Sequence, residues 1–176
     1  MPSDVSFRLH IKILKEPFIS IRNMVKFMTD VYSAHGVRPD VLGREELSLP
    51  DLRILDVGSC DHAAPLTGEQ QELFSNRNDA GPKDVIAYFV EQTIPPLNGC
   101  ARFPAGKPGL VVAHMSSRWT LAHEIGHVLG LDHVRDPADH RSLMTGSGTL
   151  EIGSILPVLS AAEIKRIRSS PLTRPA

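Results

Sequence analysis

The sequence predicts an α+β fold built on a twisted, mixed but mostly parallel β-sheet. Short segments that are apolar throughout, or that switch between apolar and polar residues, are separated by segments with apolar residues at helical spacing. This order is typical of sheets whose strands are joined by helices. The length of 176 residues suits one domain, and 41% hydrophobic with 22% charged residues is ordinary for a globular protein. We expect a single domain over residues 1–176, with a larger part up to residue 130 and a smaller part, 131–176, that ends in a helix.

The first half of the chain predicts strands around an early helix packed on the sheet. Val5–Leu14 alternates apolar and polar residues, which is typical of a half-buried strand. Ser20 is placed to cap a helix with apolar residues at helical spacing up to Tyr32, and Gly36 suits its end. The remaining elements expected here are strands at Val37–Leu42 and Leu52–Val57 and a short helix around Gly68–Ser75.

The second half predicts three strands and two helices. The first helix begins at Ser117 or Thr120 and ends at Leu129, and the second begins at a capping box formed by Ser160 and Glu163. The tail from residue 169 to residue 176 is expected to be frayed. The strands are expected at Asp84–Val90, Gly99–Phe103 and Leu110–Met115.

Charge and hydropathy argue against two classes of protein. With 19 Lys+Arg against 20 Asp+Glu, the chain has no basic excess for nucleic acid. No apolar run approaches the ~18 residues of a membrane span. The N-terminus has no basic and apolar segments of a signal peptide, so an intracellular location is the default expectation, and we expect a monomer.

Cysteines and oxygen-bearing residues each leave two interpretations open. Two buried thiols in a reducing compartment are favoured for Cys60 and Cys100, with a single disulfide as the alternative. Between residues 76 and 84 a solvated turn is favoured over a calcium loop, because EF-hand spacing is not met. The oxygen-bearing residues concerned are Asn76, Asn78, Asp79 and Asp84.

The most informative segment runs from His123 to His133 and fits H-E-x-x-H-x-x-G-x-x-H. On an α-helix, His123 and His127 lie one turn apart on the same face, so both imidazoles can reach one ion. His133 could not join them on a continuous helix, so the chain must turn back, and Gly130 is placed to end the helix with a positive φ. Three histidines leave zinc a fourth position for water, which is typical of a catalytic site.

Glu124 points about 100° around the helix from His123 and is better aimed at a bound water than at the ion. A carboxylate there can take the proton of a water that attacks a carbonyl, while zinc polarises that carbonyl. The other histidines of the chain lie in strand patterns, at a helix end or in loops, and structural or surface roles are favoured for them: His10, His35, His62, His114 and His140.

The motif resembles the zinc site of the metzincin clan of metallopeptidases. The resemblance implies a zincin-like fold, one catalytic Zn²⁺ held by His123, His127 and His133, and Glu124 as general base and acid. It also implies a Met-turn at Met144 beneath the site. Other segments are similar to small matrixin-like and archaemetzincin-like catalytic domains, and imply an edge strand that pairs with an extended peptide substrate. The residues of that strand are Gly99, Cys100, Ala101, Arg102 and Phe103.

The resemblance leaves the subfamily open. Val134 follows the third histidine and Gly146 stands two residues after Met144, and neither matches the landmarks of the best-known subfamilies. The sequence therefore predicts a zinc-dependent endopeptidase that hydrolyses peptide bonds through activated water. The alternatives are a catalytically weak or inactive zinc-binding module that recognises peptides and a hydrolase of non-peptide amides.

Overall fold

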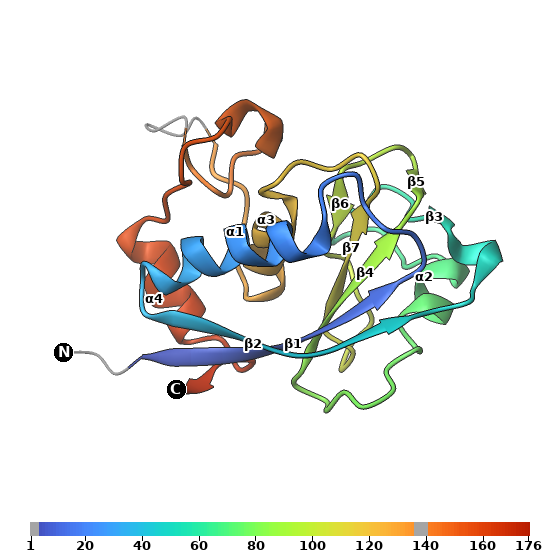
Figure 1. Cartoon of the computed structure of the whole chain (residues 1–176), viewed down its shortest axis with the longest axis horizontal. Coiled ribbons are helices and arrows are strands. Elements are labelled where there is room, and N and C mark those ends of the chain that lie inside the picture. The colour runs from blue at the N-terminus through green and yellow to red at the C-terminus, as the bar shows by residue number, and fades with distance from the viewer. Residues whose placement is uncertain (1–3, 136–140) are drawn as a thin grey trace.

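The structure is a computed structural model that describes residues 4–135 and 141–176. Its main sheet has the strand order β2-β1-β4-β7-β6, and the neighbours from β2 to β7 are parallel (Figure 1). Strand β6 runs antiparallel to β7 at the end of this order. The predicted mixed, mostly parallel sheet is confirmed. The strands are β1 (Val5–Ile13), β2 (Val37–Glu46), β4 (Val85–Val90), β6 (Gly99–Cys100) and β7 (Gly109–Ala113).

Strand β4 is buried on both faces because it lies between two hydrophobic layers. Alternate residues point to opposite faces of a strand. Ala87 and Phe89 therefore join the cluster that includes α1 (Ile21–Ser33) and α3 (Thr120–Val128), whereas Ile86 and Tyr88 join the cluster that includes α2 (Gly68–Leu73). The apolar sequence of β4 follows from this central position.

Helix α1 is amphipathic, and its buried face fixes the helix that carries the HExxH residues. Ser20 caps it by accepting a hydrogen bond from the Asn23 N–H, as the sequence predicts. At its other end, the buried Tyr32 hydroxyl donates to the backbone oxygen of Ala122 in α3 at 2.8 Å. Helix α3 is thus held by a polar bond as well as by apolar packing.

The C-terminal segment returns to the same core. Helix α4 (Ala161–Arg168) begins at the predicted capping box of Ser160 and Glu163, and Ile167 is buried in the α1/α3 cluster. The expectation of a frayed tail is wrong: β8 (Arg174–Pro175) pairs antiparallel with the start of β1. A two-residue pairing has too little pattern to be found in the sequence.

Two further strands form a separate small sheet. Strand β3 (Ile54–Asp56) is shorter than the predicted Leu52–Val57, because Pro50–Leu52 forms a 3₁₀ turn. It pairs in parallel with β5 (Gln92–Ile94), a strand that the sequence pattern does not indicate. A second 3₁₀ turn lies at Thr149–Ile152. Among the described helices, none is long and apolar enough to cross a membrane.

Cys60 and Cys100 form a disulfide, so the favoured interpretation of two free thiols is wrong. The bond joins the loop after β3 to strand β6 across 40 residues of sequence. Only the tertiary fold brings these segments together, and two isolated cysteines do not reveal it. Disulfides persist in oxidising surroundings, so the reducing compartment assumed for the thiols loses its basis.

Candidate active site

Helix α3 ends where the sequence motif requires the chain to turn. Gly130 has a φ of 104°, which a side chain would disfavour. The N–H groups of Gly130 and Leu131 donate to the carbonyls of His127 and Gly126, each at 2.9 Å. This pair of bonds is the Schellman motif that satisfies the last carbonyls of a helix. The turn sends the chain back, so that His133 faces the same point as the two helical histidines.

The three motif histidines converge through their Nε2 atoms. These atoms lie 3.1 Å apart for His123 and His127, 3.0 Å for His127 and His133, and 3.2 Å for His123 and His133. In a tetrahedral zinc site with Zn–N bonds of ~2.0–2.1 Å, nitrogen ligands are about 3.3 Å apart. The triangle therefore matches the base of such a tetrahedron to within a few tenths of an ångström.

Backbone carbonyls fix the proton on two of these rings. His123 Nδ1 is 2.7 Å from the oxygen of Leu143, and His127 Nδ1 is 2.8 Å from the oxygen of Leu131. A carbonyl oxygen only accepts, so in each ring Nδ1 carries the hydrogen and the neutral ring leaves Nε2 as a bare lone pair. Two lone pairs 3.1 Å apart repel unless a cation lies between them. The donor set therefore fits a zinc ion, with the outer nitrogens held as metal-binding histidines usually are.

Burial keeps the three imidazoles neutral. It lowers the pKa of His123 to about 4, and it is also the main reason that the pKa values of His127 and His133 are lowered. Neutral imidazole is the form that binds metal. At neutral pH, therefore, a cation can bind without first displacing a proton from His123.

Glu124 lies beside the histidines and its position is set by packing. Its carboxylate makes no hydrogen bond within the described residues, and burial raises its pKa to about 8. A cation held by the histidines would stabilise the carboxylate and oppose that shift. On its other side is Gly99 of β6: a Cβ at that position would stand only 2.7 Å from Glu124 Oε1. The absence of a side chain at Gly99 therefore makes room for the glutamate.

Met144 lies beneath the α3 helix. It is fully buried, and a Cβ on Gly126 would stand 2.5 Å from its Sδ atom. Its backbone oxygen accepts from the Val134 N–H at 2.8 Å, just after the third histidine. The residue before it, Leu143, supplies the carbonyl that holds His123. The predicted Met-turn segment thus contacts both the helix and the returning chain.

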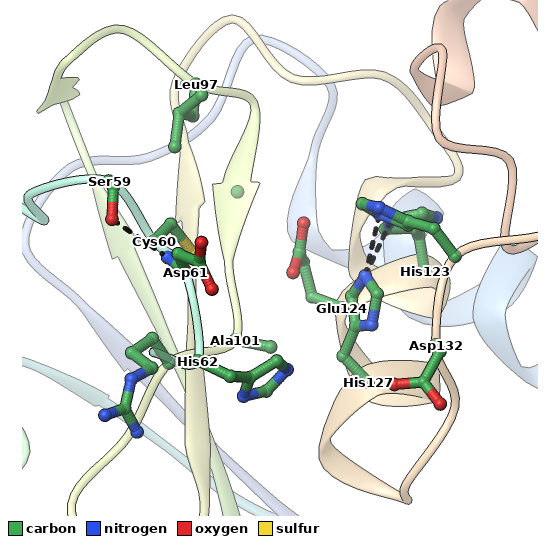
Figure 2. Close-up of a pocket in the computed structure, with 13 residues that line it drawn as sticks. Ser59, Cys60, Asp61, His62, Leu97, Ala101, His123, Glu124, His127 and Asp132 are labelled. Atoms are coloured by element: carbon green, nitrogen blue, oxygen red, sulfur yellow. Dashed lines mark hydrogen bonds between the residues drawn. The ribbon is translucent and has the colours of Figure 1, made fainter. Parts of the chain in front are cut away.

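The three motif histidines and Glu124 form one wall of a cleft of about 380 Å³. The loop that follows β3 forms the opposite wall, and Figure 2 shows His62 on that loop directed into the cleft, across from Glu124 and His127. The sequence favours a structural or surface role for His62, because no motif spacing connects this residue with the HExxH segment. Knowledge of the Cys60–Cys100 bond, which begins two residues before it, would have placed His62 near β6.

The predicted substrate strand is shorter than expected. Gly99 and Cys100 form β6 at the edge of the sheet, but residues 101–103 leave the ladder. There Arg102 donates to the oxygen of Ala64 at 2.9 Å, so the chain is drawn towards the loop opposite, and Pro104 cannot donate to a ladder. Gly99, Ala101 and Arg102 line the cleft, whereas Phe103 packs against the hydrophobic clusters.

The predicted oxygen-rich turn has contacts within the protein. Asp84 accepts from the Gly81 N–H at 2.8 Å and contacts His10 at 3.1 Å, and the Asn76 amide donates to the end of α2. These contacts favour the turn over the calcium alternative. His140, the remaining loop histidine, lies outside the described residues.

Three of the solved structures that share this fold are named as a metalloproteinase, an archaemetzincin and a zinc-dependent peptidase. Metalloproteinase-II from Bacteroides fragilis matches with a TM-score of 0.64 at 17% identity, over 94% of this chain and 52% of that one. Archaemetzincin from Methanopyrus kandleri matches with a TM-score of 0.59 at 17% identity, over 93% and 94%. A zinc-dependent peptidase from Methanocorpusculum labreanum matches with a TM-score of 0.57 at 10% identity, over 90% and 99%.

These likenesses establish the fold, since the identities are low. The chain spans about half the length of the Bacteroides protein and nearly the full length of the other two. No protein-family model and no curated protein sequence matches the chain. The predicted zincin-like fold is confirmed at this level.

Proposed function

We propose that the protein is a zinc-dependent endopeptidase of the metzincin type, with His123, His127 and His133 as metal ligands. The observation that carries the proposal is the triangle of Nε2 atoms 3.0–3.2 Å apart with two outer nitrogens held by carbonyls. The names of the solved structures that share the fold support the same conclusion. When bound, Zn²⁺ supplies a Lewis acid that acidifies water and polarises a carbonyl.

Glu124 has the position of a general base. It lines the cleft next to the ligands, its carboxylate has no competing partner among the described residues, and it can accept the proton of the attacking water. As the C–N bond breaks, the same carboxyl returns that proton to the leaving amine. The products are a carboxylate and an amine, and no covalent bond to the protein forms.

The edge of β6 gives an extended substrate a place to bind. The side of this strand away from β7 has no strand partner in the described residues, and Gly99 lines the cleft. An extended peptide can add main-chain hydrogen bonds to such an edge. With only two residues in β6, the ladder is short, so we expect the cleft walls to supply much of the substrate contact.

The test compares wild-type protein with Glu124→Gln and with His127→Ala on a library of unstructured peptides. We expect wild-type cleavage that EDTA abolishes and Zn²⁺ restores. Glu124→Gln should keep bound zinc but lose at least about 100-fold in kcat, the size typical of general base catalysis. His127→Ala should lose the metal itself. Full turnover by Glu124→Gln would exclude Glu124 as the base.

The same experiment separates the two alternatives. A zinc-binding peptide module would hold zinc and bind peptides with no chelator-sensitive cleavage by the wild type. A hydrolase of non-peptide amides would leave the peptide library intact but cleave simple acylated amines. The intact Glu124 beside the histidines favours the endopeptidase over the inactive module.

A further inference from the structure

The cleft wall opposite the motif helix carries an ionisable group that the reaction scheme above does not use. His62 lines the cleft together with Glu124 and the three motif histidines. Its imidazole is exposed and makes no hydrogen bond or ion pair within the described residues. Figure 2 shows the ring directed from the loop towards the space that lies before Glu124 and His127. An imidazole so placed has an N–H free for a ligand.

The loop that carries His62 is fastened on both sides of it. Two residues before, Cys60 is bonded covalently to Cys100 of β6, and two residues after, the oxygen of Ala64 accepts from Arg102. Both anchors lead to the strand segment that borders the same cleft. The backbone that carries His62 is therefore held at a fixed place relative to the edge where a peptide would bind, although the imidazole has no hydrogen-bond partner among the described residues.

The loop also holds its own shape through short-range bonds. The Ala63 N–H donates to the Asp61 carboxylate at 3.0 Å, and the Ala64 N–H donates to the backbone carbonyl oxygen of Asp61 at 3.1 Å. Cys60 has a φ of 52°, which non-glycine residues seldom adopt. These features give the loop a fixed shape before substrate binds. A hydrogen-bond donor on such a loop can stabilise charge in a transition state without a rearrangement of the loop.

Among the other groups that line the cleft, few can donate a hydrogen bond to a substrate carbonyl. Arg102 donates through Nη2 to the oxygen of Ala64, and its Nε is buried. The Ser59 hydroxyl is held within the loop, where it accepts from the Asp61 N–H at 3.3 Å. Glu124, Asp61 and Asp132 are acidic groups that accept when ionised. Within the described residues, His62 is thus the side chain best able to donate from the wall that faces the metal centre.

We propose that His62 is a further catalytic residue, whose imidazole N–H donates a hydrogen bond to the carbonyl oxygen of the scissile peptide as that oxygen becomes negative. The inference rests on the proposed peptidase function and extends it. When water attacks the carbonyl carbon, the π electrons move to the oxygen and Glu124 takes the proton. His62 stabilises the oxyanion until the C–N bond breaks and the proton passes to the nitrogen. His62 gains and loses no proton in this role.

The test uses His62→Ala and His62→Gln in the full chain, with His35→Ala as control because that histidine lies at the end of α1 and does not line the cleft. Removing one oxyanion donor typically costs ~10²–10³ in kcat. We expect His62→Ala to lose about 100-fold in kcat with KM changed less than about threefold. His62→Gln retains an N–H donor and should recover part of the rate, and His35→Ala should match wild type.

A binding measurement makes the test independent of turnover. A phosphinic peptide mimics the charged tetrahedral species. The matching plain peptide mimics the ground state, and its binding is measured in the Glu124→Gln background, where it is not cleaved. By calorimetry, His62→Ala should weaken the phosphinic peptide by roughly the factor lost in kcat and leave the plain peptide within about threefold. Equal weakening of both ligands would reduce His62 to a substrate-binding residue and overturn the proposal.

The disulfide provides a second perturbation of the same group. In a Cys60→Ala/Cys100→Ala variant the loop loses one anchor, so kcat should fall while bound zinc is unchanged. Adding His62→Ala to that variant should then cost much less than it does in the wild type. Wild-type kcat in His62→Ala, with chelator-sensitive cleavage still lost in Glu124→Gln, would overturn the role of His62 alone. If the wild type cleaves no peptide, the proposed function is overturned, and the role of His62 with it.

Discussion

Replacing Gly99 by alanine tests how the glutamate is positioned. The added Cβ would stand 2.7 Å from both Oε1 and Cγ of Glu124 and 2.9 Å from Cδ. Ordinary contact begins at 3.4 Å, so the side chain must withdraw by about 0.7 Å. Since no hydrogen bond holds the carboxylate among the described residues, the movement falls on Glu124 rather than on a network around it.

The cost should appear in the chemical step. A displacement of ~1 Å in a reacting group can cost ~10²-fold in rate, so we expect Gly99→Ala to lose about 10- to 100-fold in kcat. Bound zinc should change little, because β6 supplies none of the three nitrogen atoms. KM should also change little, because alanine keeps the main-chain N–H and C=O that an extended peptide would pair with. Overpacking typically costs ~1–3 kcal/mol of stability, which a folded domain of this size can tolerate.

The assay is steady-state cleavage of a fluorogenic peptide, with zinc content and thermal unfolding measured on the same samples. Gly68→Ala is the matched control, since a Cβ there meets no heavy atom within 4 Å and the residue lies in the first turn of α2. It should leave kcat unchanged. A folded Gly99→Ala protein with wild-type kcat would refute the reasoning, because Glu124 could then move without loss or is not the base.

Two further predictions concern stability. In Gly126→Ala, the Cβ would stand 2.5 Å from the Sδ of the buried Met144, so we expect a loss of about 1–3 kcal/mol in urea unfolding; an unchanged midpoint would contradict this contact. Burial raises the pKa of Asp84, but the Gly81 N–H, His10 and Arg8 outweigh it, and the net pKa is lowered. The ionised form therefore stabilises the fold above the unfolded-state pKa of ~3.9, and this contribution is lost as pH falls through the lowered value. Asp84→Asn should cost about 2–3 kcal/mol at pH 7 and progressively less below pH ~4, measured by urea unfolding; a pH-independent difference would count against the ionised carboxylate as the cause.

The parts of the molecule that follow from local pattern could be predicted from the sequence. The spacing of His123 and His127 follows from helix geometry, and the turn at Gly130 follows from the need to return His133. The capping box at Ser160 and the alternation along β1 are likewise local. In each case the cause lies within a few residues of the effect, so one chain without relatives is enough to find it.

The parts that were missed depend on contacts between distant segments. The Cys60–Cys100 bond, the pairing of β5 with β3 and the pairing of β8 with β1 join segments 38 or more residues apart. His62 was missed for the same reason, since nothing near it in the sequence resembles a site. Its place in the cleft follows from the two anchors of its loop, and both anchors lead to residues near 100.

Main-chain atoms and missing side chains, more than polar neighbours, determine the geometry of this site. The rings of His123 and His127 are oriented by the carbonyls of Leu143 and Leu131, which any residue type at those positions could supply. Three glycines then set the distances: Gly130 turns the chain, Gly126 admits Met144 beneath the helix, and Gly99 admits Glu124 beside the strand. Of the three, only Gly130 has a role that spacing reveals. The other two gain theirs from the side chain that fills the space, so packing volume determines the geometry of this site as much as its donor atoms do.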